Sequence, residues 1–297
     1  MDKKRLTKTA ELEGPNCLEN FICTFCLSMR QCLRLKYGRN NMNENLPTLV
    51  KNGSITIEEW DTRVDLAACY RLMAHFGMDD LIYNHISARV PGPNEHFLLN
   101  PFGLLYEEIT ASNLVKVDLD GKIISETENK INPAGFVIHS CIHRERPDMH
   151  CVIHTHTPAG VGVSCQEEGL LPLSQTGLLY KDLIGYHEYE GLALNLDEQK
   201  RLVKDLGEKK QLLILKNHGL LTCGRTIPEA FIMMYYLEQA CKIQIAAQAG
   251  NNVSLPRPEV QDLVHQQAMK GFGSKLGEME FKALKRRLLR NGSDHAI

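Results

Sequence analysis

The pattern of apolar and polar positions divides the chain into three parts. Residues 1–50 are polar at first and then hold four cysteines in one short segment. Residues 51–250 alternate apolar stretches of helical spacing with short β-branched runs, and residues 251–297 are polar with helical spacing. This order predicts a poorly ordered N-terminal extension over 1–50, one domain over 51–250 and a polar helical tail over 251–297.

Five helices are predicted in the central part, each from a start signal at its N-terminus. These signals are Ser, Thr or Asn caps followed by a first-turn proline or by a glutamate three positions on. The cap residues are Thr56, Asn132, Thr157, Asn195 and Thr226. The predicted helices run to Gly77, to about Arg146, over 157–168, over 196–206 and to Gly250.

Short apolar runs bounded by turn residues predict the strands between these helices. They are Leu81–Tyr83, His85–Val90, His96–Leu99, Leu114–Leu119, Lys122–Ile124, Cys151–Ile153, Leu170–Leu173, Ile184–Tyr189 and the pair around His218. Asp120-Gly121 suits a hairpin turn between two of them. Strands interrupted by few helical crossovers predict an α/β fold, a three-layer α/β/α arrangement with a mostly antiparallel central sheet.

Three histidines stand at predicted strand ends. His154 and His156, in Cys151-Val-Ile-His-Thr-His-Thr-Pro-Ala-Gly160, are two positions apart and so project to the same face of a strand. His218 ends the apolar run that begins at Gln211. Three neutral imidazoles with an open fourth position are typical of a catalytic divalent metal site, and zinc is the first candidate. The alternative is that His154 and His156 are simply hydrogen-bonded to each other without a metal.

Charge and hydropathy exclude several functions. The 297 residues carry a formal net charge of -2. There is thus no excess of positive charge of the kind that binds nucleic acid or an anionic membrane. No apolar run approaches the roughly 20 residues of a membrane span, and Met1-Asp-Lys-Lys-Arg5 leads into polar sequence and not into a signal-peptide core. We therefore expect a soluble, cytoplasmic protein.

The cysteines of residues 1–50 permit three interpretations. Cys23-Thr-Phe-Cys26 has zinc-knuckle or redox spacing, but no second CxxC or CxxH accompanies it. The segment from Leu18 to Leu35 is compatible with a short amphipathic helix. Met42 is also a possible true start of the protein.

The histidine motifs carry a resemblance to a known family. His154-Thr-His-Thr-Pro-Ala-Gly160 and Ile214-Leu-Lys-Asn-His-Gly-Leu-Leu221 are similar to the two metal-ligand motifs of the class II aldolase/adducin head-domain family, over roughly residues 50–250. The resemblance implies a class II aldolase-like fold and a zinc site of His154, His156 and His218. Family members include sugar-phosphate aldolases, an epimerase, dehydratases and the cytoskeletal adducins. Four further motifs lie before them in the chain, in the family's order, at Tyr83–Arg89, Leu99–Tyr106, Leu114–Gly121 and Asn132–His139.

The chain departs from the aldolase pattern at the positions that contact the substrate in the aldolases. Alignment from His154 backwards places the proton-transfer carboxylate of the aldolases at Gly135, and their two hydroxyl residues at Pro133 and Ala134. Their phosphate-binding asparagine corresponds to His85. The resemblance thus suggests His85 and Gly103 as substrate-binding candidates, although His85 is equally explained as a packed strand histidine. The acid/base residue stays unassigned, with Glu126 and Glu128 just upstream of Gly135.

Two functions follow from the resemblance. One is a metal-dependent lyase or isomerase of aldolase type, acting on a small hydroxycarbonyl or sugar-derived substrate. The other is an adducin-like, non-catalytic scaffold that binds cytoskeletal, actin-associated partners. Relatives commonly form fourfold rings, so a homotetramer is expected. The apolar helix over 227–249 supports a subunit contact if part of its surface is free, and does not if the helix is central within one domain.

Overall fold

The computed structural model describes residues 47–250 and 252–297. The chain divides into two units, Met1–Ser54 and Ile55–Ile297. The described part of the first unit holds the short helix α2, Thr48–Lys51. The interpretations of Cys23, Cys26, the segment 18–35 and Met42 lie outside the described residues. The rest of the description concerns the second unit.

A seven-stranded sheet forms the centre of this unit, in the order β3-β2-β1-β4-β7-β6-β5. Every pair of neighbours is antiparallel except β5 and β6, which are parallel. The prediction of a mostly antiparallel sheet is therefore confirmed. The strands are β1 (His85–Arg89), β2 (His96–Leu99), β3 (Val115–Asp118), β4 (Cys151–Thr155), β5 (Ile184–His187), β6 (Leu212–Leu215) and β7 (Gly219–Gly224).

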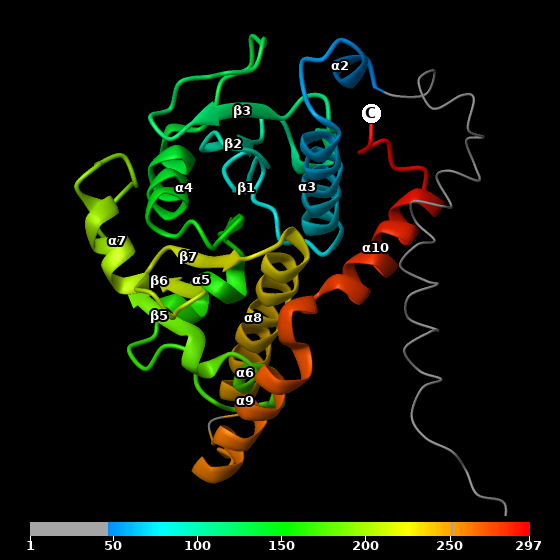
Figure 1. Ribbon diagram of the computed structural model, residues 1–297. Helices are drawn as coiled ribbons and strands as arrows, with labels where there is room; N and C mark the ends of the chain where they lie inside the picture. Colours follow the sequence, from blue (N-terminus) through cyan, green and yellow to red (C-terminus); the bar gives the residue numbers. More distant parts are fainter. Residues whose placement is uncertain (1–46, 251) are drawn as a thin grey trace, which may run out of the picture. The chain divides into compact units, whose positions relative to one another are not determined.

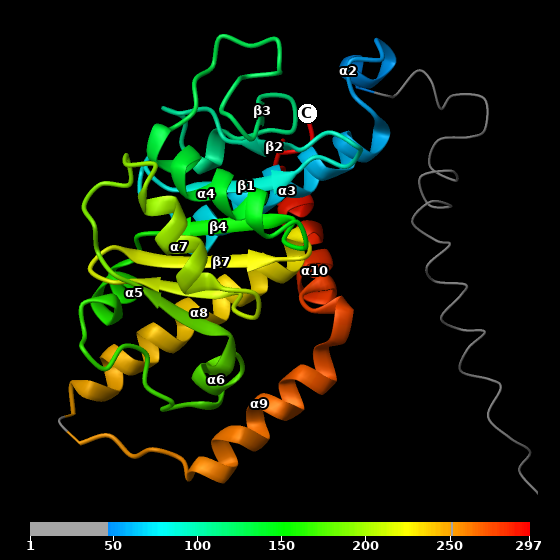
Figure 2. The same ribbon diagram turned by 60° about the vertical axis from the view of Figure 1, so that its left-hand side comes forward.

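Helices cover both faces of the sheet (Figures 1 and 2). One face carries α4 (Pro133–Glu145) and α7 (Glu198–Leu206), which contact each other. The other carries α3 (Ile57–His75) and α8 (Ile227–Gln248), and α8 contacts α5 (Pro158–Ser164), α6 (Gln175–Leu178) and α10 (Glu278–Arg290). The predicted three-layer α/β/α arrangement is confirmed. Among the described residues, no helix combines the length and the apolar character that crossing a bilayer requires.

The sheet separates two apolar cores because alternate strand residues face opposite layers. In β4, Cys151 and Ile153 belong to the core with α3 and α8, whereas Val152 belongs to the core with α4 and α7. Burial on both faces explains the continuous apolar sequence of β6, all four residues of which are buried. The same alternation turns His154 toward the α4 layer.

The predicted helix starts are confirmed with one exception. The side chains of Thr56, Asn132, Thr157 and Thr226 each accept a hydrogen bond from a backbone N–H in the first turn of the helix that follows. The cap predicted at Asn195 is wrong, because its side chain accepts from Asp197 N in a local turn and α7 begins only at Glu198.

Three of the predicted strands are not formed. Leu81–Tyr83 is a turn in which Leu81 has φ +48°, and Lys122–Ile124 makes only one isolated bridge, between Ile123 and Val117. Leu170–Leu173 is irregular, because its first two amides are satisfied by side chains and not by a neighbouring strand. Leu170 N donates to the Tyr186 hydroxyl, and Leu171 N donates to Gln244 Oε1 at 2.7 Å.

Helix α8 is the central helix of the unit. Its run Phe231–Met234 and Leu237 are buried within the chain, so this stretch does not provide a free apolar surface for a partner. Farther along α8, Ile243 and Ile245 are 38% and 40% exposed, so part of the helix surface is free and a subunit contact on this helix stays a prediction.

The C-terminal residues form α9 (Pro258–Phe272) and α10, as their helical spacing predicts. Phe281 and Leu288 of α10 are buried in the core beside α8, and Lys285 between them forms an ion pair with Asp65 of α3. The division of the chain at residues 50 and 250 stays a prediction.

Gly277 is the tightest point of the packing between α10 and α8. It has φ +79°, and a Cβ there would lie 2.2 Å from the Pro228 carbonyl oxygen. We expect Gly277→Ala to lower the free energy of unfolding by about 2 kcal/mol or more, from the positive φ and the contact together. Urea denaturation measures this change.

Gly271 in α9 is a matched control, because a Cβ there meets nothing within 4 Å. Gly271→Ala should raise the free energy of unfolding by up to about 1 kcal/mol. Equal effects of the two substitutions would contradict the assignment of close packing to Gly277.

Candidate metal centre

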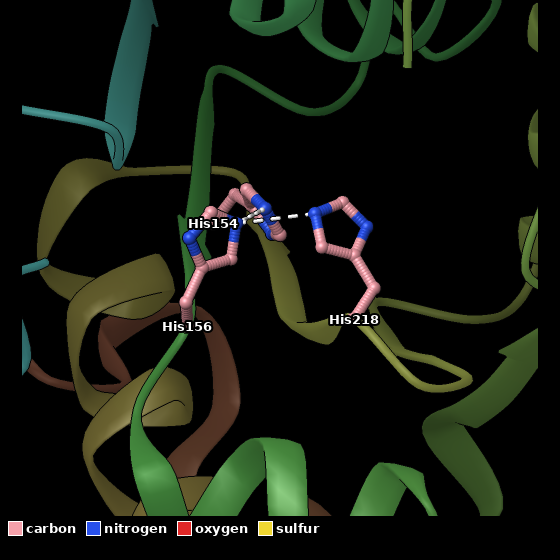
Figure 3. A group of neighbouring side chains, drawn as sticks. All are labelled: His154, His156 and His218. Atoms are coloured by element: carbon pink, nitrogen blue, oxygen red, sulfur yellow. Dashed lines mark hydrogen bonds between the residues drawn. The ribbon is translucent and has the colours of Figure 1, made fainter. Parts of the chain in front are cut away.

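The structure brings the three predicted histidines together at one end of the sheet. His154 is the fourth residue of β4, His156 follows the strand, and His218 lies in the turn between β6 and β7 (Figure 3). One nitrogen from each ring lies within 4.8 Å of the other two. His156 Nε2 is 2.8 Å from His154 Nε2 and 3.1 Å from His218 Nε2. We call this group the three-histidine cup.

Two backbone features bring His218 to the other two histidines. Asn217 takes φ +56°, which allows β6 and β7 to be joined by a short turn. A Cβ at Gly219 would lie 2.2 Å from the Thr155 carbonyl oxygen, so only glycine lets β7 approach the end of β4 this closely. The glycine after His218 is therefore part of the site's construction.

The outer nitrogens of two rings are held by acceptors. His154 Nδ1 lies 2.9 Å from the Leu220 carbonyl oxygen, and His156 Nδ1 lies 3.0 Å from Asp80 Oδ2. A carbonyl and a carboxylate only accept, so each Nδ1 carries the proton and donates it. Each Nε2 is then an unprotonated lone pair directed into the cup, the arrangement found in metal-binding histidines.

This arrangement weighs against a metal-free pair. If both rings are neutral, the two Nε2 atoms 2.8 Å apart both present lone pairs, and neither can donate a hydrogen bond to the other. A cation shared between them removes the repulsion. Three imidazole nitrogens form a donor set that suits zinc and leaves a fourth position open.

Burial keeps two rings of the cup, those of His154 and His218, neutral. Burial first, and then the neighbouring rings, lower the pKa of His154 well below its usual 6.5. Burial and His156 lower the pKa of His218 to about 4. Neutral imidazole is the form that binds a metal, so in the metal-free protein these two rings are already in the binding form at neutral pH.

His85 lies beside the cup. Its strand β1 pairs with β4 in a register that sets His85 opposite His154, and the two ring centres are 5.0 Å apart. A Cβ at Gly135 would lie 2.7 Å from His85 Cδ2. The His85 ring thus occupies the space that a side chain at position 135 would need, which explains why no carboxylate stands there.

The remaining candidates lie elsewhere. Gly103 has φ +102° in the exposed turn after β2 and does not belong to the three-histidine cup. Glu126 and Glu128 are exposed in the segment between β3 and α4. The sequence analysis missed Asp80, which orients His156. The only sign of Asp80 in the sequence was its position just before β1, and Asp79 occupies the same region, so the sequence could not distinguish the two.

Known proteins are similar to this chain in sequence and in fold. The sequence profile described as class II aldolase and adducin N-terminal domain matches residues 64–245. The chain belongs to this family. An aldolase II superfamily protein of Pseudomonas syringae has 50% identical residues and a TM-score of 0.79, with 83% of this chain and 99% of that one covered.

Two other members of the family are similar to this chain. The L-fuculose 1-phosphate aldolase of Glaciozyma antarctica is 26% identical with a TM-score of 0.69, over 87% of this chain and 99% of that one. Mouse alpha-adducin is 45% identical over 240 residues, which are 76% of this chain but 32% of the adducin. The matched region of the adducin is therefore only about a third of its length.

Asp80 provides a test of the cup that does not depend on a substrate. Asp80→Ala removes the acceptor that holds His156 Nδ1, and loss of such a partner costs roughly 10- to 100-fold in metal affinity. Competition with a chromophoric zinc chelator measures this loss. Asp79→Ala removes the same charge from the adjacent, exposed residue and should leave the affinity unchanged. Equal losses in both variants would contradict the role of Asp80.

Proposed function

We propose that the protein is a divalent-metal-dependent lyase or isomerase of aldolase type, with zinc held by His154, His156 and His218. The substrate is a small hydroxycarbonyl or sugar-derived compound. The observation that carries this proposal is the pair of Nε2 lone pairs 2.8 Å apart, with the third Nε2 at 3.1 Å.

His154, His156 and His218 would hold a divalent ion there, which would supply Lewis-acid chemistry toward a carbonyl or hydroxyl oxygen of the substrate. The chain's own residues prepare this site. Asp80 and the Leu220 carbonyl hold two of the rings in the binding tautomer. His85 borders the cup on the side of β1, where its ring centre is 5.0 Å from that of His154. Tyr189 borders the cup on the side of His218, and the ring centres of Tyr189 and His218 are 6.4 Å apart.

An adducin-like scaffold is the second candidate. Two observations favour it: the identity to alpha-adducin and the absence of a carboxylate at Gly135. Under this alternative the domain binds cytoskeletal partners and the cup contributes only to stability. The enzyme is favoured over the scaffold because three histidine nitrogens converge and because two of the rings have their Nδ1–H groups held by acceptors.

We also propose that the protein is a homo-oligomer, with a homotetramer as the expected form. The segment after β5 supports this. Its four apolar side chains Tyr189, Leu192, Leu194 and Leu196 are all more than half exposed, and Tyr189 adjoins the cup. A neighbouring subunit covering this segment would exclude water from the cup and strengthen every electrostatic interaction in it.

The enzymatic proposal is tested by metal removal. Untagged protein is stripped with a chelator, reloaded with zinc and assayed for cleavage or epimerisation of a panel of hydroxyketones and sugar phosphates. We expect turnover only after reloading. His156→Ala should lower kcat/KM on the order of a thousandfold, because it removes several kcal/mol of charge stabilisation.

His150→Ala is the control, since His150 is exposed at the opposite end of β4. Turnover should be unchanged in this variant. Fully zinc-loaded wild type that converts no member of the panel would favour the scaffold.

Assembly is tested by light scattering at micromolar concentration. We expect a species near four times 33.6 kDa, and Leu192→Asp with Leu194→Asp should dissociate it by placing charges in the contact. Met279→Asp, at a side chain exposed to 79% on α10, is the matched control. A wild-type species near 33.6 kDa would overturn the proposed oligomer.

A further inference from the structure

The two residues that flank His156 are both hydrogen-bonded to helix α8. Alternate residues of an extended chain face opposite sides, so Thr155 and Thr157 turn toward α8 while His156 turns into the cup. The Thr155 hydroxyl donates to Met234 Sδ at 3.5 Å, and the Thr157 hydroxyl donates to Glu238 Oε2 at 2.5 Å. Four residues of a helix span about 6 Å and two of a strand about 7 Å, so these two contacts match in spacing.

These contacts matter because His156 is the one cup residue that lies just beyond a strand end. His154 is inside β4, where both β1 and β7 pair with it. His218 lies in the short turn that joins β6 and β7. His156 follows Thr155, the last residue of β4 and the last that pairs with β7. Asp80 holds the ring of His156, and the two threonine contacts with α8 hold the chain on either side of it.

Glu238 is an expensive residue at its place on α8. Its side chain is 1% exposed, and Met234, Leu237 and Cys241 around it on the helix belong to the apolar core. A buried carboxylate loses its hydration, and an apolar side chain of similar volume is often neutral or stabilising instead. Lys242 Nζ lies 3.2 Å from Glu238 Oε1 but is itself half-exposed, which weakens the pair. Packing therefore does not explain this carboxylate.

The hydrogen bond with Thr157 does explain it. Within the described ranges the Glu238 carboxylate accepts one hydrogen bond, from the Thr157 hydroxyl. Thr157 Oγ1 accepts in turn from Gly160 N at 3.2 Å and so caps α5. The hydroxyl proton of a solvent-exposed cap such as Thr56 or Thr226 can go to water. Thr157 is 2% exposed, so its proton needs an acceptor from the protein.

We propose that Glu238 is a positioning residue of the metal centre, which acts through Thr157 to fix the direction of the chain at His156. It is not a metal ligand, because the ligand atoms that converge are those of the three histidines. The bond from Glu238 keeps the Thr157 side chain in its capping position, and the ring next along the chain then stays directed into the cup. The proposal rests on the proposed function, since it concerns the site that would hold the metal.

Zinc affinity of the folded variants tests this role. We expect Glu238→Ala to weaken zinc binding about tenfold in competition with a chromophoric chelator, as does loss of other groups that orient a metal ligand. Glu229→Ala is the matched control. Glu229 is also a buried glutamate of α8, but it pairs with Arg225 beyond the far end of β7. This variant should be less stable to urea and keep the wild-type affinity, and equal losses of affinity in both variants would overturn the proposal.

Two further variants separate positioning from general destabilisation. Glu238→Gln keeps an oxygen that can accept from Thr157, so it should restore the wild-type zinc affinity. An affinity as low as that of Glu238→Ala would show that the charge acts and the hydrogen bond does not. Thr157→Val breaks the same bond from the other side, and adding Glu238→Ala to it should weaken binding no further. Losses that multiply to about 100-fold in the double variant would contradict a connection through Thr157.

Crystal structures of metal-free protein provide a measurement that needs neither zinc nor substrate. His156 Nε2 is 2.8 Å from His154 Nε2 and 3.1 Å from His218 Nε2 in the wild type, and both distances should increase in Glu238→Ala. An unmoved His156 would overturn the proposal. If Glu238→Ala does not fold, Thr157→Val replaces it in both measurements. A wild type that binds no zinc would contradict the proposed function, and the position of His156 in the variant would still decide the role of Glu238.

Discussion

The two pairings of strand β4 fix the distances on which the site depends. Pairing with β1 sets His85 opposite His154, and pairing with β7 brings the Leu220 carbonyl to His154 Nδ1. A shift of one residue in either register would turn a histidine toward the α3 and α8 core, where burial of an unpaired imidazole costs several kcal/mol.

Much of this arrangement could be predicted from local sequence. Strand alternation gave the common face of His154 and His156, and threonine and asparagine caps gave four of the helix starts. Contacts between distant segments left no local signal. Asp80 is 76 positions from His156, and the amides of 170–171 bond Tyr186 and Gln244, so an apolar run that resembles a strand forms none.

The layer between β1 and α4 is unusually polar for a protein interior. Three imidazoles and a hydroxyl, joined by hydrogen bonds, take the place of apolar side chains there; they belong to His85, His139, His143 and Ser87. Buried polar groups are tolerated only when they are hydrogen-bonded, and a connected network is rigid because each bond constrains the next. The back of the cup is consequently held by directional bonds, whereas the opposite core, around α8, is held by packing of apolar side chains.

The close contact between His85 and Gly135 restricts which side chains these two positions can hold. A side chain at position 135 collides with the imidazole, and a shorter side chain at position 85 alone leaves a cavity and an unpaired His139. Neither residue can change first without loss of stability. Positions 85 and 135 are therefore coupled, and a side chain at position 135 requires a simultaneous change at position 85.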